Sequence, residues 1–307
     1  MQVALFGGTG FVGNYLIDAL TADGHTSSLL VRTNSVDKIR NTDNCRITHG
    51  DISSQEAIEA TLSGCDALIY NIGILKEKRK HGITFEELQF RGVAHVVDAA
   101  KRLGVSRILL MSSNGVKQPG TPYQETKRRA EVLVSDSGLK YTVFQPSVIF
   151  GDSHGLLEIS SQLFNDLVKP PIPAVGFHTG WVPKDNGVVL SPVHIADVAD
   201  AFVNALTNEA TIGKTYVLGG PEILTWTEMV RRIARTVGRN KWIMPMPIGV
   251  MKFAATLFDW LPFFPATRDQ LTILAEGNAA DPGDIESLIG RPPLAFTPEN
   301  LSYLRQI

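Results

Sequence analysis

The chain opens with the stretch Val3-Ala4-Leu5-Phe6-Gly7-Gly8-Thr9-Gly10-Phe11-Val12-Gly13, and this stretch decides the predicted fold. The apolar run at its start is typical of a buried parallel strand, and helical spacing of apolar residues follows from Asn14 to Leu20. A strand, three glycines at three-residue spacing and a helix together form the fingerprint of a dinucleotide-binding unit. We therefore predict dinucleotide binding rather than a purely structural glycine turn.

The three glycines have separate predicted roles. Gly7 lets the chain turn sharply after the strand, because glycine adopts backbone angles that a side chain forbids. Gly10 lets the backbone approach a pyrophosphate without a Cβ atom in the way, and Gly13 lets the helix pack closely on the sheet. The phosphates would then lie against the unpaired N–H groups at the positive end of the helix dipole.

The composition is typical of a soluble α/β protein with a sizeable core. The 307 residues suffice for one large α/β domain, or for a domain with a smaller lobe. A formal charge of −2 gives no electrostatic reason to expect nucleic acid as a partner. The only cysteines, Cys45 and Cys65, and the scattered histidines lack a ligand spacing, so we predict reduced thiols and no metal site.

No targeting or membrane-spanning segment is predicted. The first strand follows Met1 and Gln2 directly, which indicates no signal peptide. The apolar region over residues 242–264 contains Lys252, Asp259 and several prolines, so it is a poor membrane span. We expect a cytoplasmic protein. The region is interpreted either as the core of a small lobe or as a surface for a lipophilic ligand, a partner or the inner face of a membrane.

Strands and helices alternate through the first half of the chain, which predicts an α/β fold with a doubly wound parallel sheet. Further strands are predicted at 26–31, 45–49, 67–70, 107–111 and 141–145, and helices at 55–62, 85–102 and 122–135. Later in the chain we predict strands at 188–193 and 215–218, with a helix at 194–206 between them.

The pattern changes after Gln145, where prolines break up a long connection. Long connections of this kind are usually lids or substrate loops. We therefore predict a dinucleotide-binding core over residues 1–150 and a second part over 151–307. In the second part, residues 188–218 return to the sheet, and the remainder forms a smaller, mostly helical lobe for a substrate or partner.

The end of the second predicted strand indicates which dinucleotide is preferred. An acidic residue there would bind the ribose 2′-hydroxyl and repel a 2′-phosphate. The sequence instead reads Leu30-Val31-Arg32-Thr33-Asn34, and the guanidinium of Arg32 suits a phosphate. The sequence thus favours NADPH over NADH, with an ordinary exposed arginine as the alternative.

Two further strand ends are predicted to lie along the cofactor. Asp51 follows the third strand, where it is placed to accept a hydrogen bond from adenine, to cap the next helix, or both. Asn71-Ile72-Gly73 follows the fourth strand, where a glycine permits close approach to the ribose and the phosphates.

Ser112, Tyr123 and Lys127 form the predicted chemical constellation. Tyr123 and Lys127 are four residues apart on one predicted helix and therefore share a face. We expect the neighbouring ammonium and the nicotinamide to lower the pKa of the tyrosine, which makes it a usable proton donor or acceptor. The basic run Lys76–His81 is interpreted as a solvated loop at an edge where an anionic substrate or a lipid headgroup is able to dock.

Several stretches resemble the short-chain dehydrogenase/reductase superfamily in its extended, atypical branch. More narrowly, they resemble the group of the nucleotide-binding accessory subunit of respiratory complex I. Besides the opening glycine stretch, the signs are Asn71-Ile72-Gly73-Ile74-Leu75 followed by Thr84-Phe85-Glu86, then Gln145-Pro146-Ser147-Val148-Ile149-Phe150-Gly151, and Pro192-Val193-His194-Ile195-Ala196-Asp197-Val198-Ala199. The resemblance covers nearly the whole chain.

The resemblance implies a role for each matching residue. The pyrophosphate would be held by Gly7, Thr9, Gly10, Phe11, Val12 and Gly13, and the adenosine 2′-phosphate by Arg32. Asp51 and Ile52 would flank adenine, Ile72 and Gly73 the ribose, and Pro146 and Val148 the nicotinamide. Tyr123 and Lys127 match the catalytic pair, with Lys127 also on the nicotinamide ribose, and Ser112 falls near the family's serine.

The sequence also departs from the superfamily pattern. Gln89 takes the place of an asparagine that helps a proton relay, and Ser112 lies only eleven residues before Tyr123. Members of the narrower group often keep the tyrosine and lysine while holding the nucleotide as a scaffold. The resemblance therefore supports cofactor binding more directly than turnover.

Three functions follow from these features. The first is an NAD(P)H-binding atypical reductase that either reduces a lipophilic carbonyl or quinone-like compound or holds its nucleotide structurally in a respiratory or quinone-related assembly. The second is an NAD-dependent sugar-nucleotide epimerase or dehydratase, against which Arg32 and the apolar lobe argue. The third is a non-enzymatic protein that senses NADPH or assists assembly.

Overall fold

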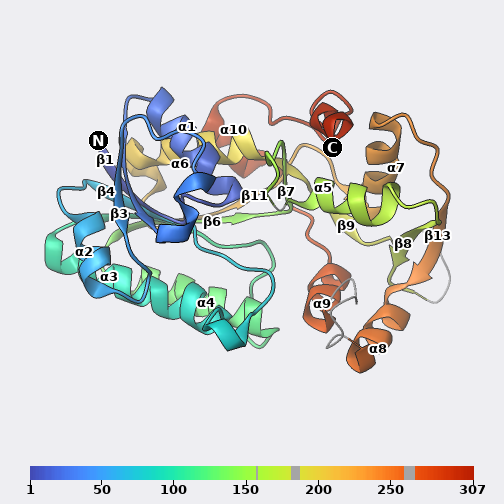
Figure 1. Cartoon of the computed structure of the whole chain (residues 1–307), viewed down its shortest axis with the longest axis horizontal. Coiled ribbons are helices and arrows are strands. Elements are labelled where there is room, and N and C mark those ends of the chain that lie inside the picture. Colours follow the sequence, from blue (N-terminus) through green and yellow to red (C-terminus); the bar gives the residue numbers. More distant parts are fainter. Residues whose placement is uncertain (157, 181–186, 259–266) are drawn as a thin grey trace. The chain divides into compact units, whose positions relative to one another are not determined.

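A seven-stranded sheet with the strand order β11-β6-β5-β4-β1-β2-β3 forms the centre of the fold (Figure 1). The computed structural model describes residues 1–156, 158–180, 187–258 and 267–307. The strands are β1 (Gln2–Phe6), β2 (Thr26–Val31), β3 (Cys45–His49), β4 (Ala67–Tyr70), β5 (Arg107–Met111), β6 (Lys140–Pro146) and β11 (Lys214–Leu218). All pairings from β3 across to β6 are parallel. The predicted doubly wound sheet is confirmed.

The strand order reverses at β1, which has β2 on one side and β4 on the other. Parallel strands that lead to opposite sides leave a crevice at their carboxyl ends, and doubly wound folds bind ligands there. The ends of β1, β2 and β4 are therefore where the sequence motifs for the cofactor converge.

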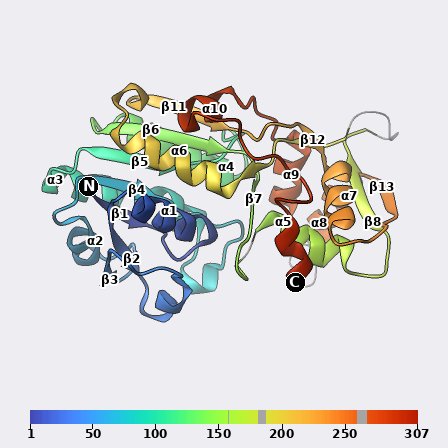
Figure 2. The same ribbon diagram turned by 90° about the horizontal axis from the view of Figure 1, so that it is seen from above.

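Helices cover both faces of this sheet (Figure 2). One face carries α1 (Phe11–Ala22) and α6 (Ile195–Thr207), and the other carries α2 (Gln55–Leu62), α3 (Gly92–Leu103) and α4 (Pro122–Ser135). The helix predicted over 85–102 differs in its first part, because Glu86–Arg91 is a π-helical segment, η3, that continues directly into α3.

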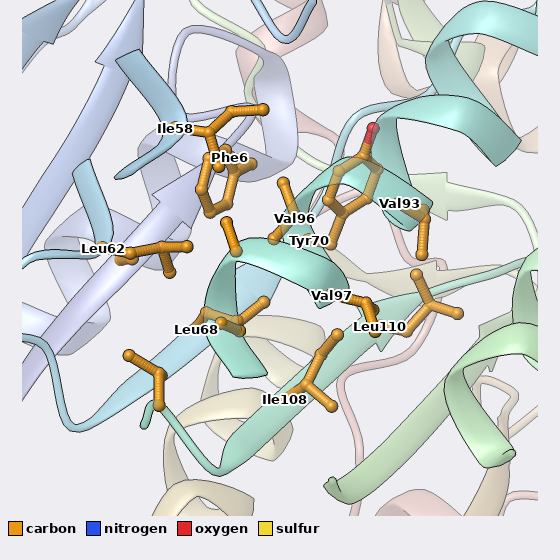
Figure 3. Packing of buried hydrophobic residues seen from close by; sticks show 14 of the residues in the cluster. Phe6, Ile58, Leu62, Leu68, Tyr70, Val93, Val96, Val97, Ile108 and Leu110 are labelled. Carbon is orange, nitrogen blue, oxygen red and sulfur yellow. The ribbon is translucent and has the colours of Figure 1, made fainter. Parts of the chain in front are cut away.

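The core under α2 and α3 is built from alternate strand residues (Figure 3). Successive side chains of a strand point to opposite faces, so every second residue reaches the same helices. Those of the three central strands are Ala4, Phe6, Leu68, Tyr70, Ile108 and Leu110, and they pack against Ile58, Leu62, Val93, Val96 and Val97. The hydroxyl of Tyr70 donates to the carbonyl oxygen of Leu88 at 2.5 Å, which ties β4 to η3.

The chain divides into two compact units. The first comprises Met1–Pro146 and Ala196–Tyr216, and the second comprises Ser147–Ile195 and Val217–Ile307. The buried guanidinium of Arg107 on β5 joins separate segments of the first unit by hydrogen bonds. It donates to the carbonyl oxygen of Ala205 on α6 at 2.6 Å and to the hydroxyls of Thr142 and Thr211 at 2.8 and 2.9 Å.

The described residues of the second unit form three small two-stranded sheets. The pairs are β7 (Ile149–Phe150) with β10 (Val193–His194), β9 (Val189–Leu190) with β12 (Leu224–Thr225), and β8 (Ala174–His178) with β13 (Ile243–Pro247). Its helices are α5 (Ile159–Leu163), α7 (Trp226–Thr236), α8 (Ile248–Phe258), α9 (Arg268–Glu276) and α10 (Gly283–Ile289). The prediction of one strand over 188–193 was wrong: β9 and β10 are separate strands in different sheets, divided at Ser191-Pro192. Proline has no N–H for a continuous ladder.

Candidate cofactor and active site

The glycine-rich turn after β1 is tightly constrained by its surroundings. Gly7 has a φ of +103°, and a Cβ atom there would lie 2.9 Å from the carbonyl carbon and oxygen of Asn71. A Cβ atom on Gly13 would overlap the carbonyl oxygen of Gly7. A Cβ atom on Gly10 would meet only that same oxygen, at 3.6 Å, so its Cα faces open space. The turn fits the close approach of a ligand at Gly10.

The start of α1 offers free backbone donors at this open position. Gly10 is the N-cap residue of α1 and has no side chain to bond the first N–H groups, and the first turn carries no acidic residue. Unpaired N–H groups at a helix start bind anions such as phosphates. The donors from Phe11, Val12 and Gly13 therefore fit a dinucleotide pyrophosphate, and their role as its ligands stays a prediction.

Asn14 is a buried residue that the sequence interpretation missed. Its side-chain Nδ2 donates to the carbonyl oxygens of Gly10 and Lys38, both at 3.0 Å, and its Oδ1 accepts from the N–H of Arg40 at 2.8 Å. Asn14 thus fixes the segment that follows Arg32 against the glycine turn. A lone asparagine just inside a helix carries no sequence signal for such long-range bonds.

An open pocket of about 690 Å³ lies at the ends of β2 and β3. It is lined by three residues predicted for the adenosine end of the cofactor, Arg32, Asp51 and Ile52. Asp51 accepts from the N–H and the hydroxyl of Ser53, both at 3.1 Å. Pockets of this size hold ligands as large as an adenosine nucleotide.

Lys127 lies on α4 and is almost completely buried, with 6% of its surface exposed. Its Nζ donates to the carbonyl oxygen of Met111 at 3.1 Å and lies 5.8 Å from the centre of the Tyr123 ring. Burial lowers the pKa of Lys127 to about 8, and the carboxylate of Glu131 opposes this shift. A Cβ atom on Gly73 would lie 3.9 Å from Nζ, so this ammonium also faces the residue predicted beside the ribose.

Tyr123 is half-buried one helical turn before Lys127. Burial raises its pKa above the usual value, and a hydrogen bond with the side chain of Ser113 lowers it by less. In the chain by itself the expected lowering by the ammonium is therefore not found, because burial dominates. The phenol is protonated at neutral pH, which suits a proton donor.

The structure brings Ser113, and not Ser112, to the tyrosine. Ser112 is buried and lines a small cavity of about 10 Å³ together with Lys127, Ile72 and Gln89. Within the described parts of the chain, its hydroxyl has no hydrogen-bond partner. Adjacent residues after a strand point in opposite directions, and this alternation is the signal that separates the two serines.

Gln89 has both ends of its amide engaged. Its Nε2 donates to the carbonyl oxygen of Ile74 at 3.0 Å, and its Oε1 accepts from the hydroxyl of Thr126 at 3.1 Å. The residue that replaces the superfamily's asparagine thus holds the segment after β4 against α4. This arrangement gives it a positioning role.

The two residues predicted beside the nicotinamide lie in different units. The carbonyl oxygen of Pro146, at the end of β6, accepts from the N–H of Asn114 at 2.9 Å. Val148 belongs to the second unit, where its carbonyl oxygen accepts from the N–H of Val193 at 3.0 Å. Their contact with a nicotinamide stays a prediction.

Within residues 1–156, 158–180, 187–258 and 267–307, no three His, Cys, Asp or Glu side chains are grouped so that they would hold a metal ion. No helix in these ranges combines the length and the apolar character that crossing a membrane requires. Cys45 and Cys65 are free thiols, and burial raises the pKa of both.

Comparison with known proteins agrees with this geometry. A family model described as NAD(P)H-binding matches residues 7–165, more than half of the chain. Divinyl chlorophyllide a 8-vinyl-reductase from Cucumis sativus is 25% identical over 87% of this chain and 65% of its own length. Subunit 9 of the NADH dehydrogenase [ubiquinone] 1 alpha subcomplex from Mus musculus is 24% identical over 98% of this chain and 79% of its own length.

The likeness to solved structures concerns the fold. UDP-glucose 4-epimerase from Thermus thermophilus, in complex with NAD, superimposes with a TM-score of 0.73 at 18% identity. The match covers 100% of this chain and 98% of the epimerase. The resemblance to the atypical branch of the superfamily and to the complex I subunit is confirmed. The chain belongs to the NAD(P)H-binding family and is an atypical short-chain dehydrogenase/reductase that binds a nicotinamide dinucleotide.

Proposed function

We propose that the chain uses NADPH to reduce the carbonyl group of a lipophilic or quinone-like compound. The observation that carries this proposal is the buried ammonium of Lys127, 5.8 Å from the ring of Tyr123, whose hydroxyl is bonded to Ser113. A cation, a phenol and a second hydroxyl on one side of a dinucleotide crevice are the groups that a carbonyl reduction requires.

Tyr123, Lys127 and Ser113 have separate roles in the proposed reaction. The nicotinamide, when bound, supplies a hydride to the carbonyl carbon. Tyr123 gives its phenolic proton to the carbonyl oxygen, so that an alcohol and a phenolate result. The ammonium of Lys127 stabilises that phenolate by its charge. Ser113 orients the phenol through their hydrogen bond.

The preference for NADPH is inferred from Arg32. Its guanidinium lines the pocket at the end of β2, and the strand end Leu30–Asn34 has no acidic residue to accept from a ribose 2′-hydroxyl. We place the pyrophosphate at Gly7, Thr9, Gly10, Phe11, Val12 and Gly13, adenine at Asp51 and Ile52, the ribose at Ile72, Gly73 and Lys127, and the nicotinamide at Pro146 and Val148.

Mass spectrometry of natively extracted protein tests the substrate class. Co-purification of NADPH with a quinone or another lipophilic carbonyl compound supports the proposal, and a UDP-sugar with NAD contradicts it. The variant Tyr123→Phe then tests the chemistry, because it removes only the phenolic hydroxyl. We expect turnover to fall by at least about 100-fold with the NADPH dissociation constant unchanged.

A second function is favoured by the relationship to the mouse subunit, which spans 98% of this chain. In this alternative the dinucleotide is held as a structural element of a respiratory or quinone-related assembly. Tyr123→Phe would then leave the assembly intact, whereas loss of nucleotide binding would disrupt it. The same variant therefore separates the two functions.

Exposed apolar side chains at Trp242, on β13 and on α8 support attachment to a membrane. Trp242 and Phe253 are 73% and 69% exposed, and Met244 and Val250 are also exposed. Residues 237–258 contain no acidic side chain, whereas Lys252 lies within α8. Aromatic side chains beside cations are typical of proteins that lie at an anionic lipid surface. We propose that this surface binds such a membrane.

A further inference from the structure

The pocket that contains Arg32 has a second basic wall. Lys78 and His81, from the short segment after β4, line the same cavity of about 690 Å³. From the sequence, these residues are interpreted as a solvated loop at an edge where an anionic substrate or a lipid headgroup is able to dock. Their side chains are exposed, and the structure adds that they share this pocket with the end of β2.

Backbone hydrogen bonds hold this segment in one shape. Lys78 and Ile83 form an antiparallel bridge, with N–H to oxygen distances of 2.7 and 3.3 Å. Between them, the N–H of His81 donates to the carbonyl oxygen of Lys78 at 2.9 Å, and Gly82 adopts a φ of +69°. We call residues Lys78–Ile83 the basic loop. These hydrogen bonds fix the backbone position of Lys78, and its side chain lines the pocket that contains Arg32.

Glu77 anchors the basic loop to the rest of the first unit. One oxygen of its carboxylate accepts from the N–H of Phe85 at 2.9 Å, and the other pairs with Nε of Arg79 at 2.8 Å. Burial raises the pKa of Glu77, but the bonds to Phe85 and Arg79 together outweigh it and hold the pKa below its usual value. Because Glu77 is bonded to Arg79, it does not neutralise Lys78.

The pocket lining carries two cations, Arg32 and Lys78, and two carboxylates. Its acidic residues are Asp51 and Glu87, and Glu87 pairs with the guanidinium of Arg91 at 3.0 Å. Across the parts of the chain that the structure describes, no acidic side chain pairs with Arg32 or Lys78. Two unpaired cations from different strand ends, facing one pocket, favour an anion between them.

We propose that Lys78, assisted by His81, completes the adenosine 2′-phosphate site that Arg32 begins. The proposal rests on the NADPH preference proposed above and names the residues that enforce it. A planar guanidinium and a mobile ammonium together match a phosphate dianion, whereas the 2′-hydroxyl of NADH carries no charge for them to bind. The basic loop thus contributes to the selection of NADPH over NADH, although it lies outside the end of β2 that carries Arg32.

Binding measurements on single variants test this assignment. Dissociation constants for NADPH and NADH would be measured for the full chain and for Lys78→Ala, with 2′,5′-ADP and 5′-ADP as competing probes. We expect Lys78→Ala to weaken NADPH and 2′,5′-ADP by about tenfold, the effect of losing one charge-assisted hydrogen bond, and to leave NADH and 5′-ADP within about twofold. Lys80→Ala is the matched control, because Lys80 is in the same run but does not line the pocket.

The measurements separate a failure of the NADPH preference from a failure of the role of Lys78. If the unaltered chain binds NADPH and NADH equally, the proposed NADPH preference fails and the role of Lys78 fails with it. If the chain prefers NADPH and Arg32→Ala abolishes that preference, but Lys78→Ala behaves as Lys80→Ala does, only the role of the basic loop is overturned. Equal weakening of both dinucleotides by Lys78→Ala would also overturn it, because the effect would not depend on the 2′-phosphate.

Discussion

The rings of Phe85 and Tyr123 form a T-shaped pair, with the ring centroids 5.6 Å apart and the planes at 80°. Its backbone N–H is held by Glu77, the anchor of the basic loop. Phe85 thus connects the basic loop, at the proposed adenosine end of the site, with the proton donor of the proposed reaction.

Replacing Phe85 with leucine tests this connection. The edge contact is worth about 0.5–1.5 kcal/mol, so we expect turnover to fall by about three- to tenfold as the phenol loses its fixed orientation. The NADPH dissociation constant should stay within about twofold, since the backbone bond to Glu77 remains. Phe90→Leu is the control, because Phe90 faces Arg129 instead of Tyr123. Equal effects of the two variants on turnover would argue against a specific role for Phe85.

The two adjacent serines give a matched pair of variants. Ser113→Ala removes the partner of the Tyr123 hydroxyl, and we expect turnover to fall by about 100-fold. Ser112→Ala removes a buried hydroxyl that has no partner in the described structure, so unfolding free energy should be unchanged or slightly higher. Steady-state kinetics and urea denaturation of both variants measure these effects. The assignment is wrong if Ser112→Ala causes the greater kinetic loss.

The lowered pKa of Lys127 predicts a pH dependence. In the proposed reduction, Lys127 must be charged and Tyr123 protonated, so kcat/KM should be level below about pH 8 and fall by about tenfold per pH unit above it. Lys127→Arg keeps the charge at all these pH values and should remove the fall, at lower overall activity. A profile that stays level to pH 10 would contradict the role of Lys127.

The same shift has the opposite sign for stability. Between about pH 8 and the usual lysine pKa near 10.4, the unfolded chain binds a proton at Lys127 that the folded chain does not. The contribution of Lys127 to the free energy of unfolding therefore rises with pH across that window and is lowest below it. Urea denaturation of Lys127→Met against the unaltered chain isolates this contribution.

Arg107 is expected to be the most sensitive charged residue of the first unit. Its burial lowers its pKa to about 10, and Arg107→Ala would leave the hydroxyls of Thr142 and Thr211 and two backbone carbonyls without this donor. We expect a loss of about 3 kcal/mol in unfolding free energy. Arg102→Ala is the control, because its ion pair with Glu59 is on the surface and should matter by less than about 1 kcal/mol. Similar losses would contradict the central role of Arg107.

Vesicle binding tests the proposed membrane surface. We expect co-sedimentation with vesicles of phosphatidylcholine and phosphatidylglycerol, and less with phosphatidylcholine alone, because Lys252 favours anionic headgroups. Trp242→Ser with Phe253→Ser should reduce binding by about tenfold or more, as two large exposed side chains are lost. Ile223→Ser is a control at an exposed apolar residue outside β13 and α8. Binding that is unchanged by the double variant would rule out this surface.

Much of the sheet is predictable from the sequence because its strands are short apolar runs between clear turn signals. The strands at 26–31, 45–49, 67–70 and 107–111 have the predicted limits. The central ones are buried on both faces, so their composition alone marks them. The strand predicted at 188–193 fails because an apolar run does not reveal that Pro192 interrupts the pairing.

The candidate site is only partly readable from the sequence. The positions of Tyr123 and Lys127 follow from helical spacing, which is local. The choice between Ser112 and Ser113 depends on how the chain leaves β5, and the place of Lys78 depends on a bridge to Ile83 and on Glu77 reaching Phe85. Contacts of this kind depend on the conformation of irregular segments, and no periodicity in the sequence encodes them.

The bonds made by Arg107 also bear on how this chain can diversify. They join β5, β6 and the segment that returns through α6, all inside the first unit. The described residues of 147–195 and 217–307 supply none of these partners. Those segments can therefore change by insertion, deletion or replacement, and so acquire new substrate selectivity. The hydrogen bonds of Arg107 that hold the first unit together would remain.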